Sequence, residues 1–378
     1  MNAKIKILYC LQAIGSGGVE RRRLSLAKLL PKEKYEIKVI CTQVQNEFYK
    51  EFEAVGVEII PVGLLKKTFD FTIHKKVQKV IDEFRPDIIH GAVFEGVTMA
   101  LMNGFIKRVP IIVLEETSDP INRSWRANLL LKVYSLFADK FVGVSQASCN
   151  YLKDAAKIKP SKIKLINNGV KKPRVVADIE IRELKEQLGI SNNTFVIGSV
   201  GRMVSDANKR FSDLIKAVSL LIKKGYEIKL ILVGDGKERP GYESLAKELK
   251  VENEVIFTSY QNDVAKYYNI MNAFSLVSAH ESFGLVLAEA MLHKLPVVAT
   301  RVGGMQYIVD DKETGFLVEK FNVSEIADRL EQLYLNKDLQ TSLGVKGYTK
   351  AINRYTEEQY VSEVEKMYVH LLRSKNIL

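Results

Sequence analysis

The chain has 378 residues, of which 47% are hydrophobic and 27% are charged, and its formal net charge is +11. This composition excludes an intrinsically disordered chain, and the length exceeds what one hydrophobic core usually supports, so two domains are expected. No apolar run approaches the ~20 residues that span a bilayer. The cysteines lack metal-type spacing, which favours reduced core thiols in a cytoplasmic protein: Cys10, Cys41 and Cys149.

Short apolar runs alternate with helical patterns along the whole chain. In the first half the predicted strands are 5–11, 37–41, 58–61, 87–91, 111–114, 141–144 and 164–166. In the second half they are 195–200, 229–233, 255–258, 273–277, 297–299 and 315–318. This alternation predicts an α/β fold in which each half is a Rossmann-like parallel sheet, doubly wound with helices on both faces.

A hinge is predicted between the halves, at Asn168-Gly-Val-Lys-Lys-Pro173. We predict an N-terminal domain at 1–172, a C-terminal domain at 173–355 and a final helical segment at 356–378, which either crosses back to the N-terminal domain or lies on the surface. Ligands of such sheets bind at the carboxyl ends of the strands. The expected site is therefore a cleft in which the two domains face each other.

The glycine loop Gly15-Ser16-Gly17-Gly18 follows the first predicted strand and precedes a helix. The amides of Gly17 and Gly18 are candidates to contact a phosphate or an acceptor, and a tight turn is the alternative. The loop matches neither the phosphate loop of ATPases nor Gly-x-Gly-x-x-Gly, which disfavours ATPase and dinucleotide-binding functions.

Two polar side chains in the first half are further candidates. We predict that His90 and Glu116 end their strands and face the cleft, where they contact the acceptor or the transferred sugar. A structural role for either residue is an equal alternative.

Basic residues are concentrated between positions 123 and 174. An anionic membrane surface or a polyanionic acceptor fits this charge, nucleic acid is disfavoured because no binding motif accompanies it, and a solvated basic face is the alternative. Within this region, residues 125–137 predict a helix with apolar and basic faces, which either rests at a lipid headgroup interface or belongs to the core.

Two cations follow the first strand of the second half. Arg202 comes directly after the strand, and Lys209 is expected to open the next helix, so both point to the carboxyl end of the sheet. Fixed cations there stabilise the negative charge that builds on a departing diphosphate. The chain has no Asp-x-Asp motif, so we predict chemistry without a metal and without any cofactor.

The segment from Ser278 to Ala290 predicts a loop that opens an apolar helix. The amides of Phe283, Gly284 and Leu285 would lie unpaired at the helix N-terminus, where they favour a diphosphate. Glu289, one turn into the helix, needs hydroxyls such as those of a ribose to offset its desolvation. In the loop, Glu281 is placed to accept hydrogen bonds from a hexose. His280 either contacts the sugar or is a hydrogen-bonded loop residue.

These fragments together resemble the retaining glycosyltransferase family 4, which has the GT-B fold. The pattern Glu281-x7-Glu289 is accompanied upstream by Arg202 and Lys209 and downstream by Gly303-Gly304. Gly17-Gly18, Asn168-Gly169-Val170 and Val233-Gly234-Asp235-Gly236 also fall in the family's order.

The resemblance implies an acceptor-binding first domain, a donor-binding second domain and retention of the α configuration. It implies catalytic roles for Glu281, Arg202 and Lys209. It places Gly17, Gly18, Gly234, Tyr260, His280, Phe283, Gly284, Leu285 and Glu289 at the donor. Two departures from the family are Arg210, where relatives often have glycine, and Glu115-Glu-Thr-Ser-Asp119, where many relatives have a histidine.

The predicted function is transfer of a hexose or N-acetylhexosamine from a nucleotide-sugar, with UDP the first choice, to a lipid-linked or surface-polysaccharide acceptor such as a lipopolysaccharide intermediate. The enzyme is expected in the cytoplasm, with the inner face of the cell membrane as a candidate site. The alternatives are a nucleotide-sugar epimerase, a storage-glucan or disaccharide synthase, and a non-catalytic partner or scaffold.

Overall fold

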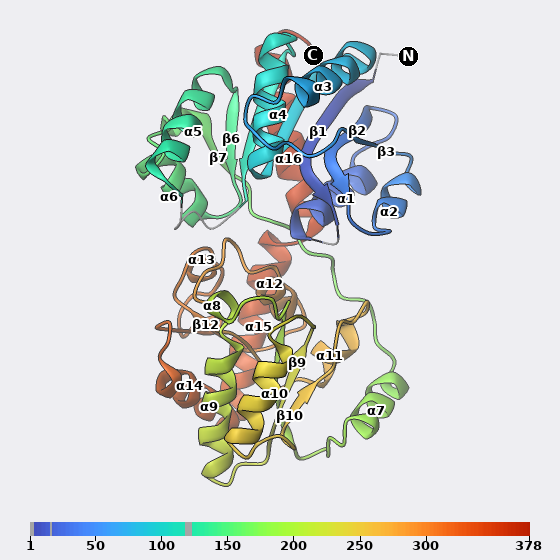
Figure 1. Cartoon of the computed structure of the whole chain (residues 1–378). Helices are drawn as coiled ribbons and strands as arrows, with labels where there is room; N and C mark the ends of the chain where they lie inside the picture. The colour runs from blue at the N-terminus through green and yellow to red at the C-terminus, as the bar shows by residue number, and fades with distance from the viewer. Residues whose placement is uncertain (1–3, 16, 118–122) are drawn as a thin grey trace. The chain divides into compact units, whose positions relative to one another are not determined.

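A computed structural model of the protein describes residues 4–15, 17–117 and 123–378 (Figure 1). The chain forms two compact units, Met1–Gly169 together with Glu357–Leu378, and Val170–Thr356. The first boundary falls inside the Asn168-Gly169-Val170 segment, and the last helix clusters with the first unit. Each unit is described separately below.

The first unit contains a seven-stranded parallel sheet with strand order β3-β2-β1-β4-β5-β6-β7. Its strands are β1 Ile5–Ile14, β2 Tyr35–Val44, β3 Glu58–Pro61, β4 Ile88–Ala92, β5 Ile111–Glu116, β6 Lys140–Gly143 and β7 Ile163–Leu165. Its helices are α1 Gly18–Leu29, α2 Tyr49–Glu53, α3 Phe71–Phe84, α4 Val93–Ile106, α5 Trp125–Phe137, α6 Gln146–Asp154 and α16 Glu357–Ser374, with a short 3-10 turn at Pro160–Lys162.

The second unit contains a six-stranded parallel sheet with strand order β10-β9-β8-β11-β12-β13. Its strands are β8 Phe195–Val200, β9 Ile228–Val233, β10 Val255–Phe257, β11 Ala273–Leu276, β12 Val297–Thr300 and β13 Phe316–Val318. Its helices are α7 Asp178–Gln187, α8 Asp206–Lys209, α9 Phe211–Lys223, α10 Arg239–Glu248, α11 Ala265–Ile270, α12 Leu285–Leu292, α13 Met305–Ile308, α14 Val323–Leu335 and α15 Lys337–Arg354.

Each sheet is covered by helices on both faces, which confirms the predicted doubly wound architecture. In β1, Ile7, Tyr9 and Leu11 pack with α1 and α16 on one face, whereas Leu8 and Cys10 pack with α3 and α4 on the other. This alternation with a period of two is what a strand buried on both faces requires, and it explains why the strands have almost continuous apolar sequences.

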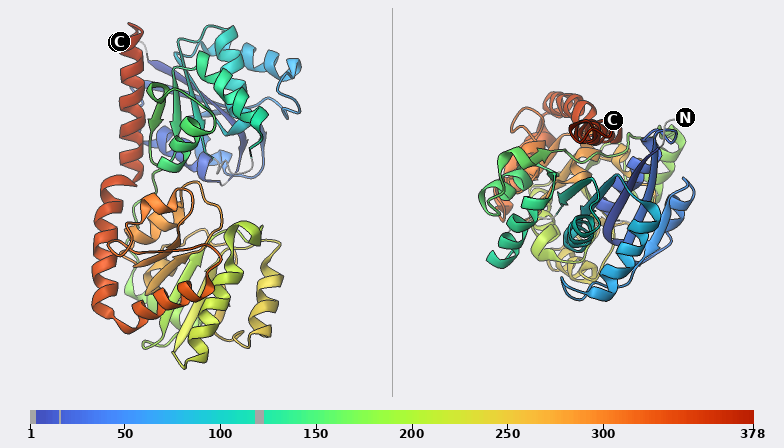
Figure 2. Two further views of the ribbon diagram at one scale, coloured as in Figure 1. Left: turned by 90° about the vertical axis from the view of Figure 1, so that its left-hand side faces the viewer. Right: turned by 90° about the horizontal axis from the view of Figure 1, so that it is seen from above.

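The last helix, α16, lies along the α1 face of the first sheet (Figure 2). Val361, Val364, Tyr368 and Leu372 are buried there beside β1 and α1. The spacing of three to four residues places these side chains on one face of the helix. The chain's last segment is therefore part of the first unit's core.

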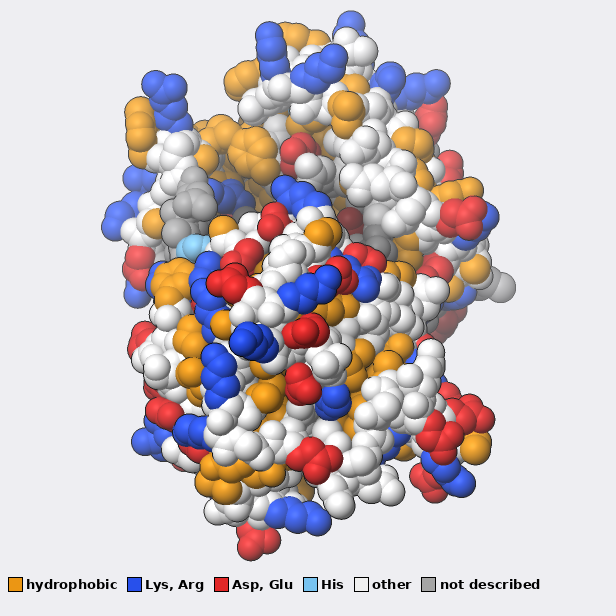
Figure 3. All heavy atoms as spheres, turned by 60° about the horizontal axis from the view of Figure 1, so that its bottom comes forward, with side chains coloured by type: hydrophobic (Ala, Val, Ile, Leu, Met, Phe, Trp, Pro, Cys, Tyr) orange, Lys and Arg blue, Asp and Glu red, His pale blue; other side chains and the backbone are white. Residues whose placement is uncertain are grey.

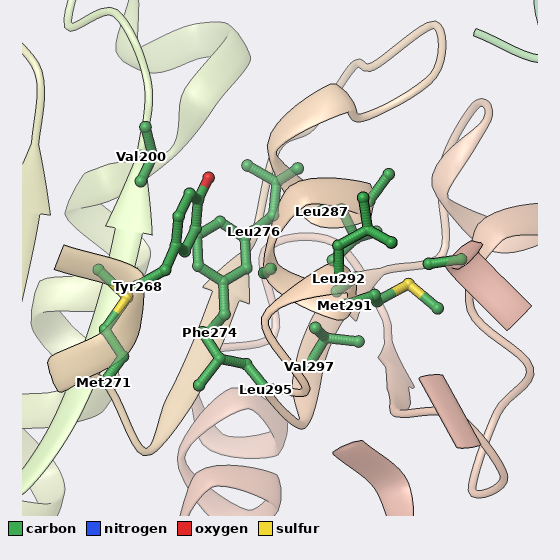
Figure 4. Packing of buried hydrophobic residues seen from close by; sticks show 14 of the residues in the cluster. Val200, Tyr268, Met271, Phe274, Leu276, Leu287, Met291, Leu292, Leu295 and Val297 are labelled. Atoms are coloured by element: carbon green, nitrogen blue, oxygen red, sulfur yellow. The ribbon is translucent and has the colours of Figure 1, made fainter. Parts of the chain in front are cut away.

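In the second unit, α11 and α12 cover one face of the sheet (Figure 4). Tyr268 of α11 packs against Phe274 of β11, with ring centroids 5.8 Å apart, and Leu287 and Met291 of α12 belong to the same cluster. Because α12 packs on β11 in this cluster, its N-terminus is held near the carboxyl end of that strand. None of the helices in the described residues is long and apolar enough to cross a membrane.

Candidate active site

The strand order of the second sheet reverses between β8 and β11, which are paired in the middle of the sheet. β8 continues to β9 on its other side, and β11 continues to β12. Loops after the two central strands therefore diverge and leave room at their carboxyl ends, which is where ligands bind in doubly wound sheets. Arg202 follows β8, and the segment from Ser278 to Gly284 follows β11, as the sequence predicts.

The loops after β8 and β11 bring Lys209 and Glu281 into direct contact. Lys209 Nζ donates a hydrogen bond to Glu281 Oε2 at 2.7 Å, and the two side chains are 25% and 19% exposed. The N–H of Ala279 also donates to the carbonyl of Asn208 at 2.8 Å, which ties the two loops together. Two of the three predicted catalytic side chains thus meet in a partly open position.

The position of Lys209 in its helix differs from the prediction. Lys209 is the last residue of the one-turn helix α8, and the longer helix α9 begins only at Phe211. Between them Arg210 has φ = 54°, in the left-handed region that favours glycine. Arg210 pairs with Asp213 at 2.7 Å, and this pairing raises the pKa of its guanidinium. This left-handed backbone is one that glycine adopts without steric cost, so it is consistent with the departure from the family pattern noted at Arg210.

The N-terminus of α12 offers unpaired backbone donors. Gly284 is the N-cap residue with φ = 99°, and no side chain caps the helix. Within the described residues, the N–H groups of Phe283, Gly284 and Leu285 have no hydrogen-bond acceptor. Because the helix dipole adds to these donors, the position suits an anion such as a diphosphate.

The Gly303-Gly304 turn holds the backbone of the loop that carries Glu281. The N–H of Gly304 donates to the carbonyl of Glu281 at 3.0 Å, and a Cβ atom at Gly303 would lie 1.8 Å from that carbonyl oxygen. A side chain at Gly303 would therefore displace Glu281. The turn positions a predicted catalytic carboxylate, a role that the sequence pattern alone did not specify.

Glu289 lies one turn into α12, where its carboxylate meets a buried hydroxyl. Tyr268 donates a hydrogen bond to Glu289 Oε2 at 2.9 Å. Burial raises the pKa of Tyr268, as does the neighbouring carboxylate, and the ring stacks on His293 with centroids 4.6 Å apart. In Figure 4 the Tyr268 hydroxyl lies at the edge of the apolar cluster. The structure thus identifies Tyr268, which the sequence did not single out, as a partner that orients Glu289.

Other predicted donor contacts lie at neighbouring strand ends of the same sheet. Gly234, with φ = 138°, follows β9, and its N–H donates to the Ser259 carbonyl at 2.9 Å. A Cβ atom there would lie 2.0 Å from the Gly201 carbonyl oxygen, so the loops after β8 and β9 pack closely. Arg202 and Tyr260 are exposed, and His280 is partly buried in the loop before Glu281.

In the first unit, the strand order reverses between β1 and β4, and the glycine loop follows β1. Gly17 is the N-cap of α1 and Gly18 is its first residue, whereas Ser16 lies outside the described residues. A Cβ atom at Gly17 would lie 2.6 Å from Glu20 Oε2. A carboxylate therefore already lies at this helix N-terminus, in contrast to the N-terminus of α12.

The expectation that His90 ends its strand and faces a cleft is wrong. His90 is the third residue of β4 and is fully buried, because Gly91 and Ala92 continue the strand past it. Its Nδ1 lies 2.6 Å from the hydroxyl of Tyr368 in α16, and its Nε2 lies 3.2 Å from Glu115 Oε2. Burial lowers the pKa of His90 to about 4, so the ring is neutral at pH 7. These contacts give His90 a structural role.

Arg23 and Glu115 complete this buried network. The Arg23 guanidinium lies 2.5 Å from Glu115 Oε2, donates to the Tyr360 hydroxyl at 2.8 Å and covers the Tyr9 ring. Arg23 holds the pKa of Glu115 well below its usual range despite burial. The sequence analysis did not identify a role for either residue. The available signal for Arg23 is its position next to Leu24, on the helix face that also includes Ala27 and is buried. We call Arg23, Glu115, His90, Tyr360 and Tyr368 the buried network.

Glu116 ends β5, as predicted. It is buried, and Arg123 donates a hydrogen bond to its Oε1 at 2.8 Å. Ser118 and Asp119 of the departure from the family pattern lie outside the described residues. Within the described part of that departure, Glu116 therefore pairs with a cation of the chain itself.

Among the described residues, neither a cluster of metal ligands nor an exposed thiol accompanies the candidate site. Within the described residues, no group of three or more His, Cys, Asp or Glu side chains could hold a metal ion. Cys10, Cys41 and Cys149 are buried free thiols. Burial raises the pKa of Cys41 and of Cys149 to about 11, which leaves them unreactive.

Two family descriptions match the chain in succession, Glycosyltransferase Family 4 over residues 16–172 and Glycosyl transferases group 1 over residues 180–350. An uncharacterized glycosyltransferase of Haemophilus influenzae is 30% identical over 350 residues, which are 90% of this chain and 94% of the relative. The N-acetyl-alpha-D-glucosaminyl L-malate synthase of Bacillus anthracis is 26% identical over 98% of each chain.

The UDP-Gal:alpha-D-GlcNAc-diphosphoundecaprenol alpha-1,3-galactosyltransferase of Escherichia coli is 22% identical over 99% of each chain. Among solved structures, Anabaena HepE in complex with UDP superposes with a TM-score of 0.84 and 22% identity, over 97% of this chain and 100% of that chain. This structural likeness establishes the two-domain GT-B fold.

Proposed function

The chain belongs to glycosyltransferase family 4 and is a glycosyltransferase, and on this premise we propose that it is a retaining, metal-independent enzyme acting on a UDP-linked sugar. The sugar is a hexose or N-acetylhexosamine, and the acceptor is a hydroxyl of a lipid-linked or surface-polysaccharide intermediate. The names of the relatives from Bacillus anthracis and Escherichia coli, and the UDP bound to HepE, motivate these choices.

The observation that carries the proposal is the Lys209–Glu281 pair beside the uncapped N-terminus of α12. A diphosphate bound to the amides of Phe283, Gly284 and Leu285 would lie next to Lys209. As the bond to the sugar breaks, negative charge builds on the departing phosphate oxygen, and the ammonium of Lys209 stabilises it. Arg202, exposed after β8, is positioned on the same edge of the sheet to add a second cation.

Each carboxylate has a separate role in this proposal. Glu281, positioned by the Gly303-Gly304 turn, accepts hydrogen bonds from the hexose hydroxyls. Glu289, oriented by Tyr268, accepts from the ribose hydroxyls of the nucleoside. Gly234 and Tyr260, at the ends of neighbouring strands, contact the rest of the nucleotide.

The acceptor proton needs a base on the face from which the diphosphate leaves. We assign this role to the departing phosphate oxygen itself, which takes the proton as the acceptor oxygen attacks the same face of the sugar. This assignment produces retention without a protein general base. With Lys209 and Arg202 neutralising the phosphate, the step needs no divalent metal.

A thermal-shift panel tests the donor. The protein is heated with UDP, GDP, ADP and their common sugar conjugates, in EDTA and again with magnesium. A nucleotide that binds only the folded state at a hundredfold above its Kd adds about 2.7 kcal/mol, which raises Tm by a few degrees. We expect UDP and one UDP-sugar to stabilise the protein in EDTA. No shift with any nucleotide would contradict the proposal.

Turnover then separates transferase from epimerase. The stabilising UDP-sugar is incubated with and without a lipid-linked acceptor, and both free UDP and sugar isomers are followed. We expect UDP release that depends on the acceptor. Conversion of the donor to an isomer without an acceptor would instead identify an epimerase.

A further inference from the structure

Helix α5 exposes a continuous apolar stripe. Trp125, Leu129 and Leu136 are 69%, 52% and 65% exposed, and Val133 and Phe137 on the same side are also exposed. The spacing of three to four residues places them in one row along the helix. Leu131 and Tyr134 on the opposite side are buried in the first unit. α5 is thus not the core helix that the sequence left as an alternative.

The end of α4 extends this stripe. Phe105 and Ile106 are both more than half exposed, and the Phe105 ring lies 4.7 Å from that of Phe137. We call Phe105, Ile106, Trp125, Leu129, Val133, Leu136 and Phe137 the α5 surface. Large exposed apolar patches of this kind mark interaction sites, whereas single exposed apolar side chains are ordinary.

The charged side chains of α5 and of the two residues before it have one sign. Residues 123–137 include Arg123, Arg126 and Lys132 but no Asp or Glu, and Arg126 lies over the Trp125 ring at 5.5 Å. Much of the face in Figure 3 instead mixes Lys and Arg with Asp and Glu. The apolar row of α5 is accompanied on its own helix only by cations, which complements an anionic lipid surface that offers phosphates above an apolar layer.

A groove lies at the C-terminal ends of α4 and α5. Its volume is about 560 Å³, and it is lined by Gly104, Phe105, Arg108, Val109, Pro110, Ile112, Phe137, Asp139, Lys375 and Ile377. Phe105 and Phe137 belong to both the groove and the stripe. Lys375 is paired with Asp139 of the same lining at 3.1 Å, and Arg108 adds a further cation to the apolar lining, a combination that suits a lipid acyl chain and its phosphate.

We propose that the α5 surface docks the protein on an anionic lipid bilayer. Trp125 lies at the headgroup level, Leu129 and Leu136 enter the acyl boundary, and Arg126 and Lys132 contact lipid phosphates. A second copy of the chain is disfavoured as the occupant, because a symmetric contact would bring these cations against each other. The inference rests on the proposed function for its purpose, since docking would bring the enzyme to a lipid-linked acceptor.

Trp125 is the chain's single tryptophan, so its fluorescence reports on the α5 surface directly. The full chain is titrated with phosphatidylcholine vesicles that contain or lack phosphatidylglycerol, at low and high salt. We expect a blue shift of the emission and co-sedimentation only with phosphatidylglycerol, both weakened by salt. An unchanged spectrum with phosphatidylglycerol vesicles would overturn the proposal.

The variant pair Leu129→Glu with Leu136→Glu tests the apolar contact. Loss of two inserted leucines and gain of two repelled charges should weaken vesicle binding at least about a hundredfold. The control is Leu335→Glu on α14, a leucine as exposed as Leu136, which should bind as the unchanged protein does. Equal binding by the double variant, or a dimer of the unchanged protein that this variant dissociates, would overturn the proposal.

A charge variant guards against misfolding of the leucine variant. Arg126→Gln with Lys132→Gln changes two exposed side chains, and at about fivefold for each lost charge it should weaken vesicle binding by more than tenfold. Thermal stabilisation by UDP is measured on every variant and should not change. Failure of the lipid proposal is then seen in vesicle binding alone, and failure of the donor proposal in nucleotide binding alone.

Discussion

Ion pairs near the carboxyl ends of the two sheets differ in how far they are buried. In the first unit, Arg23 and Glu115 are fully buried and paired with each other, and among the described residues Arg23 Nε and Glu115 Oε1 have no hydrogen-bond partner. In the second unit, Lys209 and Glu281 are paired but partly exposed, beside amides that have no acceptor. The difference teaches that strand-end position alone does not mark a functional residue. Full burial of an ion pair identifies the structural charge, and partial exposure beside unpaired backbone amides identifies the candidate for substrate binding.

Breaking the buried pair should have the largest effect. Arg23→Met leaves Glu115 without its cation inside the first unit, so the free energy of unfolding should fall by about 3–5 kcal/mol. Urea denaturation measures this change. The double variant Arg23→Met with Glu115→Leu removes both charges and should recover most of the loss. A loss below about 1 kcal/mol in the single variant would mean that the network does not hold the unit together.

Breaking the open pair should instead remove catalysis and spare the fold. Lys209→Ala should lower kcat by about 10²–10³-fold, because a fixed cation at the leaving phosphate is lost. Its Tm should stay near that of the unchanged protein, since partly exposed ion pairs contribute little to stability. The matched control is Lys216→Ala, an exposed lysine on α9. Near-normal turnover in both Lys209→Ala and Glu289→Ala would contradict the proposed mechanism.

Acid should destabilise the protein through His90. Burial sets its pKa at about 4 in the folded state, against 6.5 for an ordinary histidine, so the unfolded chain binds the proton first. The stability it contributes is complete above pH 6.5 and is lost as the pH falls towards 4, by up to about 3 kcal/mol. Unfolding by urea across this range measures the slope. In His90→Gln that part of the slope should disappear, and persistence of the full slope would exclude His90 as its source.

The smallest of these effects concerns Glu289. Tyr268→Phe keeps the ring that packs on Phe274 and His293 but removes the hydroxyl that orients the carboxylate. We expect UDP to bind about tenfold more weakly, as for a lost hydrogen bond to a charged group, with kcat nearly unchanged. Calorimetric titration of UDP and a turnover series separate the two. An unchanged affinity would show that the Tyr268 hydroxyl does not orient Glu289 for UDP binding.

The fold could be predicted from sequence because it depends on local periodicity. Strands buried on both faces are apolar almost without interruption, and the helices repeat every three to four residues, so both sheets were found. Lys209 and Glu281 could be placed near strand ends of the same sheet from their motifs, but their direct contact was not predicted. Residues 118–122 of the first unit lie outside the described part of the chain.

The buried network could not be predicted, because its partners are distant in sequence. Tyr360 and Tyr368 belong to α16. Tyr360 follows Arg23 by 337 residues, and Tyr368 follows His90 by 278 residues. Arg23 stands in a run of three arginines, a composition typical of an exposed helix face, and His90 lies next to the last residue of the predicted strand 87–91. Only the tertiary packing of α16 decides that these polar side chains lie inside.

The central claim is that the amides of α12 and Lys209 bind the diphosphate of a nucleotide-sugar. Its most direct test is calorimetric titration of UDP into the unchanged protein and into Lys209→Ala, both in EDTA. The account predicts metal-free binding by the unchanged protein and a Kd more than tenfold higher for Lys209→Ala. Equal affinity of the two proteins, or binding that appears only when magnesium is added, would contradict it.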